Sequence, residues 1–515
     1  MVRQRFYRYA PLVLGIGELL FYGELLFGWA TLVYVLKEEG YYSHLCTNGT
    51  ANNETTNEEN TPPTCAEQDV ILNLVFTVGI FSLQGGILFA GLLFDYFGTR
   101  FLRLLLHLLL LSGLIIMAFS SPSIPDLLFP GMVCITIGGF PILFTNIQIG
   151  NLFGNHRATI MTLLSGCLDS SSFVMLLIKL GYEGGISIQI AFGTLAGATS
   201  FFFINTFIFL PKRHIPWPLP PDYGQKKKKD DMTDLAEKMD ENREEQDKEN
   251  VPSKTSNDES NTVSRQLVVT RRKDFPTVKS CICCPLFVMF NIWFSVLQLR
   301  LLYFLGTLNP FLVQITDGDE KLVSQYTTIF SFYQLCGVFV APFSGLILDR
   351  NKSRQSGSPR GPYEDLRDSV LAFTLTTLLY VVFSICNVIP VIEVLYVTYF
   401  LHIITRGFMY ALTAAVLPIF FPSQYFGTLY GLVVAASSII GLLQFPLFIV
   451  SQKYFDNDPL VINLILLMAC MVTIILPIYI HFYTKRKNKD FNIKEIKEQR
   501  NESAGKDNPV NVEEI

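Results

Sequence analysis

The chain has 515 residues, of which 50% are hydrophobic and 16% are charged, and its mean hydropathy is +0.36. Soluble globular proteins carry roughly 25% charged residues, so the composition excludes a water-soluble fold. The net charge of −4 excludes a generally basic nucleic-acid binder. The 10 cysteines are spread along apolar segments, which excludes a dense disulfide scaffold. The composition indicates a protein that crosses a membrane many times.

Twelve apolar stretches are long enough to cross a bilayer, for which a helix needs about 20 residues. The six in the first part of the chain are Ala10–Leu36, Val70–Phe94, Phe101–Ser120, Leu127–Phe153, Ala158–Gly181 and Ile186–Leu210. The six in the second part are Leu286–Ile315, Ser324–Leu348, Ser369–Val388, Val394–Ile419, Phe426–Val450 and Leu460–Tyr483. The sequence therefore predicts an all-α membrane protein with twelve transmembrane helices.

Two polar segments divide the chain. Residues 1–210 are predicted to form a six-helix bundle, residues 211–284 a disordered cytoplasmic linker, residues 285–484 a second six-helix bundle, and residues 485–515 a cytoplasmic tail. The linker is too polar for apolar burial to offset the entropy of ordering it. Three cysteines, Cys281, Cys283 and Cys284, lie just before the seventh span. They are candidates for S-palmitoylation, with unmodified thiols as the alternative.

The distribution of basic residues predicts the orientation, because cytoplasmic loops are enriched in Lys and Arg. These residues gather before the first span, in alternate loops and after the last span: Arg3, Arg5, Arg8, Arg100, Arg103, Arg350, Lys352, Arg354, Arg360, Arg367, Lys485, Arg486, Lys487 and Lys489. The remaining loops hold few, among them Lys37, Lys179, Lys321 and Lys453. Both termini are therefore expected to be cytoplasmic.

The first loop is expected to face the outside. It contains two glycosylation sequons, at Asn48 and Asn53. It also contains Cys46 and Cys65, the only cysteines that the predicted topology exposes to an oxidising compartment. A disulfide between them is predicted, with two free thiols as the alternative.

A short motif recurs after the second and eighth spans. Its two copies are Gly91-Leu-Leu-Phe-Asp95 with Arg100, and Gly345-Leu-Ile-Leu-Asp349 with Arg350. The glycines would let helices approach closely, and the carboxylates would cap and pair at helix ends as a cytoplasmic gate. Recurrence at matching positions predicts parallel six-helix repeats. Such repeats are typical of a transporter of the major facilitator type, with a site between its halves.

Charged residues near the membrane centre each need a reason, since one costs about 2.5–3.5 kcal/mol on insertion scales. The helical rise places Glu24, Asp169, Arg300 and Arg406 near the midplane, and Glu18 toward the inner side of the first span. The acids lie in the first half and the arginines in the second. This sorting predicts a polar central pathway and allows an ion pair between the halves, with pairing inside one half as the alternative.

Further polar residues accompany these charges. Ser170, Ser171 and Ser172 follow Asp169 and could bind a polar solute, although serine hydroxyls also bond to carbonyls of their own helix. Asn146 and Gln148 either line the inner mouth or staple the turn after the fourth span; the staple is favoured. The substrate-binding candidates are Tyr22, Glu24, Asp169, Ser170, Ser171, Gln298, Arg300, Asn309 and Arg406. Walker, dinucleotide and paired metal-ligand motifs are absent, so neither an enzyme nor a cofactor or metal is expected.

Several segments resemble solute carrier family 43. They are Thr145–Gly154 with His156-Arg157, Asp169–Ser172, Ile178-Lys179, His214–Pro221, Gly306–Asn309, Phe421–Ser423 with Phe426-Gly427, and Leu443–Pro446. The resemblance implies a facilitative transporter. One branch of the family carries large neutral amino acids, and the other is a sodium-independent facilitator of purine nucleobases. The Asn146 run, the Asp169 cluster and the Pro-rich segment are similar to the nucleobase branch. Gln298-Leu-Arg300 is similar to the amino-acid branch, and Glu24 departs from both.

Three functions are compatible with these features. The leading one is alternating-access transport of purines such as adenine, guanine and hypoxanthine across the plasma membrane. The second is transport of large neutral amino acids, with Arg300 holding the substrate carboxylate. The third, a transport-inactive scaffold acting through the linker, is disfavoured by the repeated motif and the sorted charges. The expected partners are a small-molecule substrate and the lipid bilayer; no nucleic acid is expected, and protein partners are not predicted.

Overall fold

The computed structural model describes residues 2–48, 65–212, 215, 277–340, 364–422, 425–455 and 458–487. These residues are helical apart from their connections, and within them the only extended pairing is one isolated bridge between Ser121 and Ile124. The all-helical class that the sequence predicts is therefore confirmed for the described part of the chain.

The first half of the chain, residues 2–212, forms long helices interrupted by short 3-10 or π turns. Its α-helices are α1 (Val2–Tyr22), α2 (Trp29–Glu38), α3 (Ala66–Phe97), α4 (Thr99–Phe119), α5 (Leu128–Gly139), α6 (Ile142–Ile147), α7 (Arg157–Ser170), α8 (Val174–Glu183) and α9 (Ile188–Ile204). Its shorter turns are η1 (Leu25–Gly28), η2 (Ser43–Asn48), η3 (Pro125–Leu127), η4 (Gln148–His156), η5 (Ser171–Phe173) and η6 (Asn205–Phe209).

The second half, residues 277–487, begins with a single helical turn before its first long helix. Its helices are α12 (Val278–Ile282), α13 (Pro285–Ile315), α14 (Glu320–Leu335), α16 (Glu364–Cys386), α17 (Val394–Phe420), α18 (Phe426–Gly441), α19 (Gln444–Tyr454) and α20 (Leu460–Val472). After two turn residues, the helical conformation resumes from residue 475 to residue 487.

Local chemistry explains where the two central helices of the second half begin. Pro285 is the first residue of α13, a position where its fixed φ suits the helix and its missing N–H costs no bond. Asp319 caps α14, because its carboxylate accepts hydrogen bonds from the backbone N–H groups of Lys321 and Leu322 at 2.9 and 3.2 Å. The start of each helix is thus set by a residue that the sequence places there.

Within the described residues, nine helices are long and apolar enough to cross a membrane, or ten if the bent pair α1 and α2 is counted as one span. They coincide with ten of the twelve predicted spans. The eighth predicted span continues beyond residue 340, outside the described residues, and α17 covers the tenth as a 27-residue helix without meeting the same apolar criterion. The total of twelve and the division into two six-helix bundles stay predictions.

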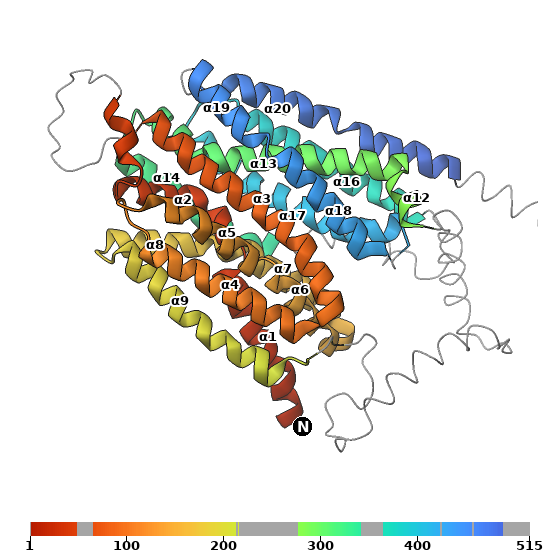
Figure 1. The fold of residues 1–515 in the computed structure, drawn as a ribbon. Coiled ribbons are helices and arrows are strands. Elements are labelled where there is room, and N and C mark those ends of the chain that lie inside the picture. The colour runs from red at the N-terminus through yellow and green to blue at the C-terminus, as the bar shows by residue number, and fades with distance from the viewer. Residues whose placement is uncertain are drawn as a thin grey trace, which may run out of the picture.

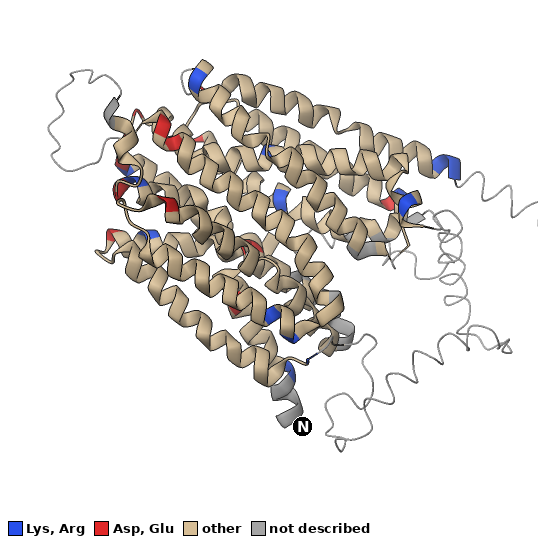
Figure 2. Ribbon diagram, viewed as in Figure 1, with Lys and Arg blue, Asp and Glu red and all other residues tan. Residues whose placement is uncertain are grey.

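The helices run between two ends of the molecule, with charged residues concentrated at those ends and few along the spans (Figure 2). We call the end with Cys46 and Cys65 the first-loop end, and the end with Lys212 and Thr277 the linker end. The N-terminus lies at the linker end (Figure 1). Helices α4 and α9 form one side of the molecule, α19 and α20 form the opposite side, and α2, α3 and α13 lie between them (Figure 1).

Several sequence predictions fall on residues whose placement is not described. Asn53, Gly345, Asp349 and Arg350 lie outside the described residues, as do most of the linker and tail. The structure describes the backbone of Asp95 and Asn48 as helical, but it does not describe the side chains of these two residues. Gly91 lies in α3, and among described residues nothing would come within 4 Å of a Cβ at this position. The close helix approach expected there is not seen among the described residues and stays a prediction.

One residue assigned to a loop from the sequence lies elsewhere. Arg103 is counted with the basic residues of the second loop, although the predicted span Phe101–Ser120 includes it, and it lies in α4 and is fully buried. The prediction was wrong because a residue near the start of a span is compatible with either location until its helix is oriented. In the first loop, the sulfur atoms of Cys46 and Cys65 are joined in the structure, and their Cα atoms lie 5.5 Å apart.

Candidate functional site

The first span is broken near its middle, where Gly23 and Glu24 separate α1 from η1. The two helical parts are bent by 43°. Glu24 has φ −130° and ψ 51°, outside the helical range, and its backbone N–H donates to the Ser171 hydroxyl instead of to a carbonyl of its own helix. Irregular backbone inside a membrane is stable only where protein or a polar cavity satisfies it, and in transporters such breaks commonly form binding sites.

Close packing around the break depends on residues from two other spans. Gly139 in α5 has no side chain, and a Cβ there would collide with the carbonyl of Tyr22. The Ser171 hydroxyl also donates to the Leu168 carbonyl at 2.8 Å, so this serine holds the break against α7 and η5. The break is therefore fixed from the fourth and fifth spans.

Glu24 forms an ion pair with Arg406, which α17 contributes from the second half of the chain. Arg406 also lies near Asp169 of α7, with 3.3 Å between Nη2 and Oδ1. Glu24 and Arg406 are each 2% exposed, whereas the Asp169 side chain is 20% exposed. The three residues, which we call the central triad, carry two carboxylates for one guanidinium. They join the two halves near the level of the helix break.

Arg406 retains unused hydrogen-bonding capacity. Its guanidinium carbon lies 3.9 Å from the centre of the Phe27 ring, a cation–π contact. Its Nε and Nη1 atoms are buried and have no hydrogen-bond partner among the described residues. Arg406 and Asp169 line a cavity of about 10 Å³ together with Gln334, Gly337, Val340, Ile403 and Gly407. A cavity of this size holds roughly one water molecule, so the centre is closed in this conformation.

A second group of polar residues adjoins the triad on α13, α14 and α17. The Tyr410 hydroxyl, one helical turn beyond Arg406, donates to Gln298 Oε1 at 3.1 Å. Gln298 Nε2 is buried without a hydrogen-bond partner among the described residues. Gln334 and His402 contact each other through their Nε2 atoms at 3.3 Å. Gln298 and Arg406 therefore present donors that a ligand could use if the centre opened.

Ser170 links the two halves directly. Its hydroxyl donates to the Leu335 carbonyl at 3.0 Å and accepts from the Val338 backbone N–H at 3.0 Å. Both partners belong to the eighth span. In this conformation Ser170 and Ser171 are occupied by protein partners, so their role as substrate contacts stays a prediction.

Three further candidates lie away from the triad. The Tyr22 hydroxyl donates to the Leu195 carbonyl within the first half, at 2.9 Å. Arg300 is fully buried within the second half and bonds Ser384 at 3.2 Å and Asn463 at 3.1 Å. Asn309 is buried beside the interface of α2 and α13. Among the described residues, the cross-half ion pair that the charge sorting allows is thus made by Arg406 and not by Arg300.

The halves are also held together at the first-loop end by Lys179 of α8. Its ammonium donates to the Ser324 carbonyl and to the hydroxyls of Thr327 and Thr328, the latter two at 3.0 and 2.8 Å. It lies 3.7 Å from Glu183 of its own helix. One buried cation thereby holds α8 against three residues of α14.

A further contact between the halves joins α3 to α13 and α19. Asn73 donates to the Gly306 carbonyl at 2.9 Å and accepts from Gln444 Nε2 at 2.9 Å. Thr77 donates to Gln444 Oε1 at 2.7 Å. These bonds lie on the side of the triad toward the first-loop end, so the two halves are in contact on that side.

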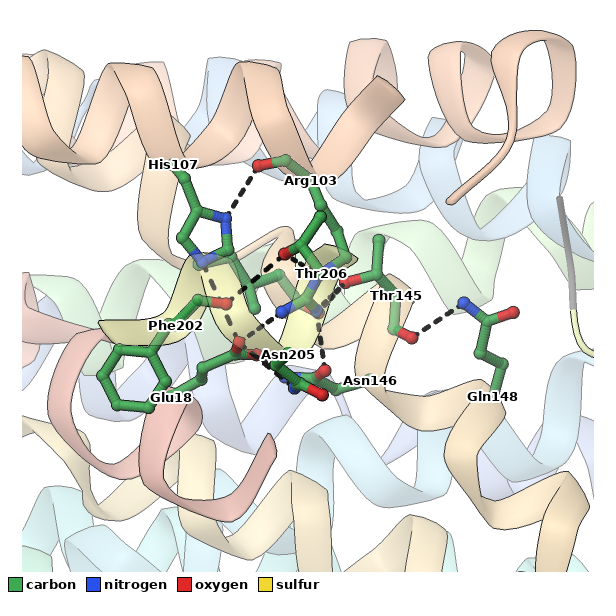
Figure 3. Close-up of polar contacts among 10 residues, drawn as sticks. Glu18, Arg103, His107, Thr145, Asn146, Gln148, Phe202, Asn205 and Thr206 are labelled. Atoms are coloured by element: carbon green, nitrogen blue, oxygen red, sulfur yellow. Dashed lines mark hydrogen bonds and ion pairs between the residues drawn. The ribbon is translucent and has the colours of Figure 1, made fainter. Parts of the chain in front are cut away.

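A separate buried network holds the first half together toward the linker end (Figure 3). Arg103 pairs with Glu18 and also donates to Thr206, Thr145 and Asn146, at 2.9, 2.9 and 2.8 Å. Asn146 in turn donates to the second oxygen of Glu18 at 2.8 Å. Both charges are fully buried, and their partners come from the first, third, fourth and sixth spans. The network stabilises one half as a unit.

The turn after the fourth span holds the beginning of the linker. Gln148 donates to Thr99 at 2.9 Å and accepts from the Ile215 N–H at 2.8 Å, and Asn151 donates to the Ile215 carbonyl at 2.8 Å. These contacts agree with the staple interpretation of this turn. Arg100 donates to the Leu210 carbonyl at 3.2 Å, so it caps the end of the sixth span in this conformation.

Sequence reasoning missed the roles of Arg103 and Lys179, which it counted among the loop charges although both lie inside predicted spans. A signal existed for each. His107 follows Arg103 by one turn inside an apolar run, and two polar residues one turn apart indicate a buried polar face. The start of α14 carries Ser324, Thr327 and Thr328, an unusually polar stretch for a span and a suitable partner for a cation.

The fold and site together define a multi-pass membrane transporter with a charged centre between two halves. Comparison with known proteins agrees. The profile of the Major Facilitator Superfamily matches residues 66–445. The chain is 36% identical to "Equilibrative nucleobase transporter 1" of Bos taurus, over 93% of this chain and 97% of that protein. It is 29% identical to "Large neutral amino acids transporter small subunit 3" of Homo sapiens, over 92% and 93% of the two chains.

The chain therefore belongs to the Major Facilitator Superfamily, and the resemblance seen in the sequence is confirmed, including its greater similarity to the nucleobase branch. The prediction of a transporter and not an enzyme is confirmed with it. Among solved structures, an auto-inhibited peptide transporter of the POT family superimposes with a TM-score of 0.52 at 12% identity, covering 93% of this chain and 97% of that one. At that identity the match supports the fold alone.

Proposed function

We propose that the chain is a sodium-independent, facilitative transporter of purine nucleobases such as adenine, guanine and hypoxanthine. The observation that carries the proposal is the charge of the central triad. Two carboxylates, from Glu24 and Asp169, already surround the single guanidinium of Arg406. A neutral ring with N–H donors suits such a site better than a ligand with its own carboxylate.

The alternative, a large neutral amino acid, needs a cation for the α-carboxylate. Arg300 was the candidate from the sequence, but Ser384 and Asn463 hold it inside the second half, away from the triad. Arg406 could serve only by giving up an acidic partner, and the other carboxylate would then repel the substrate. The amino-acid transporters among the relatives keep this alternative in view, yet the charge arrangement favours a purine.

Each residue of the proposed site has a distinct task. Asp169 is the more exposed carboxylate and would accept a hydrogen bond from a purine N–H. Nε and Nη1 of Arg406, with Gln298 Nε2, would donate to a ring nitrogen or to the carbonyl of guanine or hypoxanthine. Glu24 would keep Arg406 oriented. Binding at Asp169 would weaken its attraction to Arg406 and so loosen the contact between the halves.

Alternating access requires a gate on each side of this centre. Lys179, Asn73 and Gln444 would form the outer gate. The inner gate would use the repeated motif, and substituting its carboxylate Asp95 tests this role. Asp95→Asn keeps the shape and removes the charge, so we expect a changed transport rate at an unchanged surface level. Unchanged uptake per surface molecule would contradict this gating role.

We further propose that the protein resides in the plasma membrane with both termini in the cytoplasm. The excess of Lys and Arg at the linker end supports this orientation. The first loop would then be extracellular, glycosylated at Asn48 and Asn53, and closed in the oxidising compartment by the Cys46–Cys65 disulfide.

The deciding experiment is a competition panel in cells that express the protein. Uptake of labelled adenine is measured against unlabelled hypoxanthine, guanine and leucine, with sodium replaced by choline in a parallel set. We expect purines to compete, leucine to have no effect, and sodium removal to leave uptake unchanged. Uptake of labelled leucine without uptake of adenine would reverse the assignment.

A further inference from the structure

Three polar residues of α3 follow one another at intervals of one helical turn. Asp69, Asn73 and Thr77 are spaced four residues apart, so they lie on the same face of the helix. Asn73 and Thr77 bond residues of the second half directly, through the Gly306 carbonyl and the Gln444 amide. Asp69 lies nearest the first-loop end and has no direct hydrogen bond to a described residue of the second half.

The facing part of α13 is interrupted by Pro310. Proline has no N–H, so the Gly306 carbonyl lacks the bond of a regular helix and accepts one from Asn73 at 2.9 Å. Helix α13 runs toward the first-loop end, whereas α3 starts there. Asn309, almost one turn beyond Gly306, is therefore displaced toward the same end as Asp69 is from Asn73.

Asp69 and Asn309 line the same small cavity between the halves, together with Asn73, Gly306 and Pro310. Its volume is about 10 Å³. Asn309 is 2% exposed, and its Oδ1 is buried without a hydrogen-bond partner among the described residues. A cavity of this size holds roughly one water molecule, and a buried acceptor requires a donor.

The charges around the cavity indicate that this donor is neutral. Lys37 Nζ lies 2.6 Å from Asp69 Oδ1, so the carboxylate already has its counter-ion. A metal cation would compete with Lys37 for the same oxygens. A water molecule has two O–H donors, which match the two acceptors that the halves present, the Asp69 carboxylate and Asn309 Oδ1.

We propose that one ordered water molecule bridges Asp69 of α3 to Asn309 of α13. It adds a link on the first-loop side of the bonds that Asn73 and Thr77 make between the halves. Asn309 is then a gate residue and not a substrate contact. This gating role rests on the proposed alternating-access function, because substrate can enter from this side only when the halves separate. The water site itself does not depend on that function.

The first test is an experimental structure of the full chain at a resolution that shows ordered water, with Asn73 still bonded to Gly306. We expect one density peak within hydrogen-bond distance of both the Asp69 carboxylate and Asn309 Oδ1. The absence of that peak would overturn the proposal. The result involves no substrate, so it is independent of whether the protein transports purines.

The second test measures how often the pathway opens to the outside. Ile403 lines the central cavity, so Ile403→Cys supplies a thiol for an impermeant reagent added to cells. Asn309→Leu removes the acceptor and should raise the modification rate roughly threefold to tenfold, the effect of one hydrogen bond on the opening equilibrium. The rate should be the same in sodium and in choline.

Asn291→Leu is the matched control, because it is the same substitution on the same helix. The Asn291 amide oxygen accepts from Ser295 of α13, and the modification rate should not change. Surface biotinylation corrects each rate for the amount of protein at the membrane. An unchanged rate in Asn309→Leu, or an equal rise in Asn291→Leu, would overturn the gating role. A sodium-dependent rate would replace the water with a cation and so contradict the proposal.

Discussion

Removing the charge of Asp169 should damage transport more than folding, whereas removing that of Glu24 should do the reverse. Both carboxylates face Arg406, but the Asp169 side chain is 20% exposed and the Glu24 side chain only 2%. Replacing a carboxylate by an amide of similar shape leaves the packing intact. The two substitutions Asp169→Asn and Glu24→Gln therefore isolate the effect of charge at two depths of burial.

The magnitudes follow from this difference in burial. A hydrogen bond to a charged group contributes about 1.5–3 kcal/mol, so loss of the Asp169 contact to substrate should reduce uptake roughly tenfold to a hundredfold. Glu24→Gln breaks the more deeply buried ion pair, but its cost should stay below the about 3–5 kcal/mol of a buried charge with no partner, because Asp169 remains 3.3 Å from Arg406. This loss of stability should lower the amount of protein at the cell surface.

Adenine uptake per surface-biotinylated molecule measures the first effect, and the surface level measures the second. A double-mutant cycle identifies the partner of Asp169. Losses should be strongly non-additive for Asp169→Asn with Arg406→Gln. The matched control is Asp169→Asn with Arg300→Gln, which should be additive, because Arg300 bonds Ser384 and Asn463 instead.

Two outcomes would distinguish direct contact of Asp169 with the substrate from a gating role of its ion pair. Loss of some purines and retention of others in Asp169→Asn would indicate direct contact with the ring edge. Equal loss of all substrates, with coupling to Arg406 alone, would indicate a gating role for the ion pair. Normal adenine uptake by Asp169→Asn would refute both interpretations.

Three further predictions concern the gate, the fold and the topology. Lys179→Met removes the cation that α14 binds, which should open the proposed outer gate more often. An impermeant thiol reagent added from outside should then modify a cysteine placed in the central pathway faster. An unchanged modification rate would exclude a gating role for Lys179. Glu18→Gln leaves Arg103 buried without its counter-ion and should cost about 3–5 kcal/mol, seen as a lower melting temperature in detergent; an unchanged melting temperature would contradict the network's role. Enzymatic deglycosylation should shift gel mobility, and Asn48→Gln with Asn53→Gln should abolish the shift; a surviving shift would contradict the topology or the choice of sites.

The sequence by itself determined the class of the protein and most of its helices. A membrane span must satisfy its own backbone hydrogen bonds and remain apolar over about 20 residues. Each span can therefore be recognised from its own stretch of sequence, nearly independently of the others. The cost of a buried charge likewise made Glu24, Asp169 and Arg406 conspicuous, because an intramembrane charge without a partner is rarely tolerated.

The tertiary structure decided which of these residues meet. Arg300 and Arg406 have similar predicted depths, and only the orientation of α13 and α17 directs one toward Ser384 and the other toward Glu24. The break at Glu24 was not predicted, since no proline marks it. The Glu24 N–H is satisfied by Ser171, which lies 147 residues further along the chain.

Arg103 and Lys179 illustrate the same limit at the ends of spans. Hydropathy locates a residue along the membrane normal only to within a few positions. Near a helix end, a residue placed with that precision can lie either in a solvated loop or in a buried polar network. Burial depends on the rotation of the helix and on what its neighbours offer: Glu18 and Asn146 for Arg103, and the polar start of α14 for Lys179. Pairing between spans is a property of their packing, because contacts between distant segments form only when the helices are assembled.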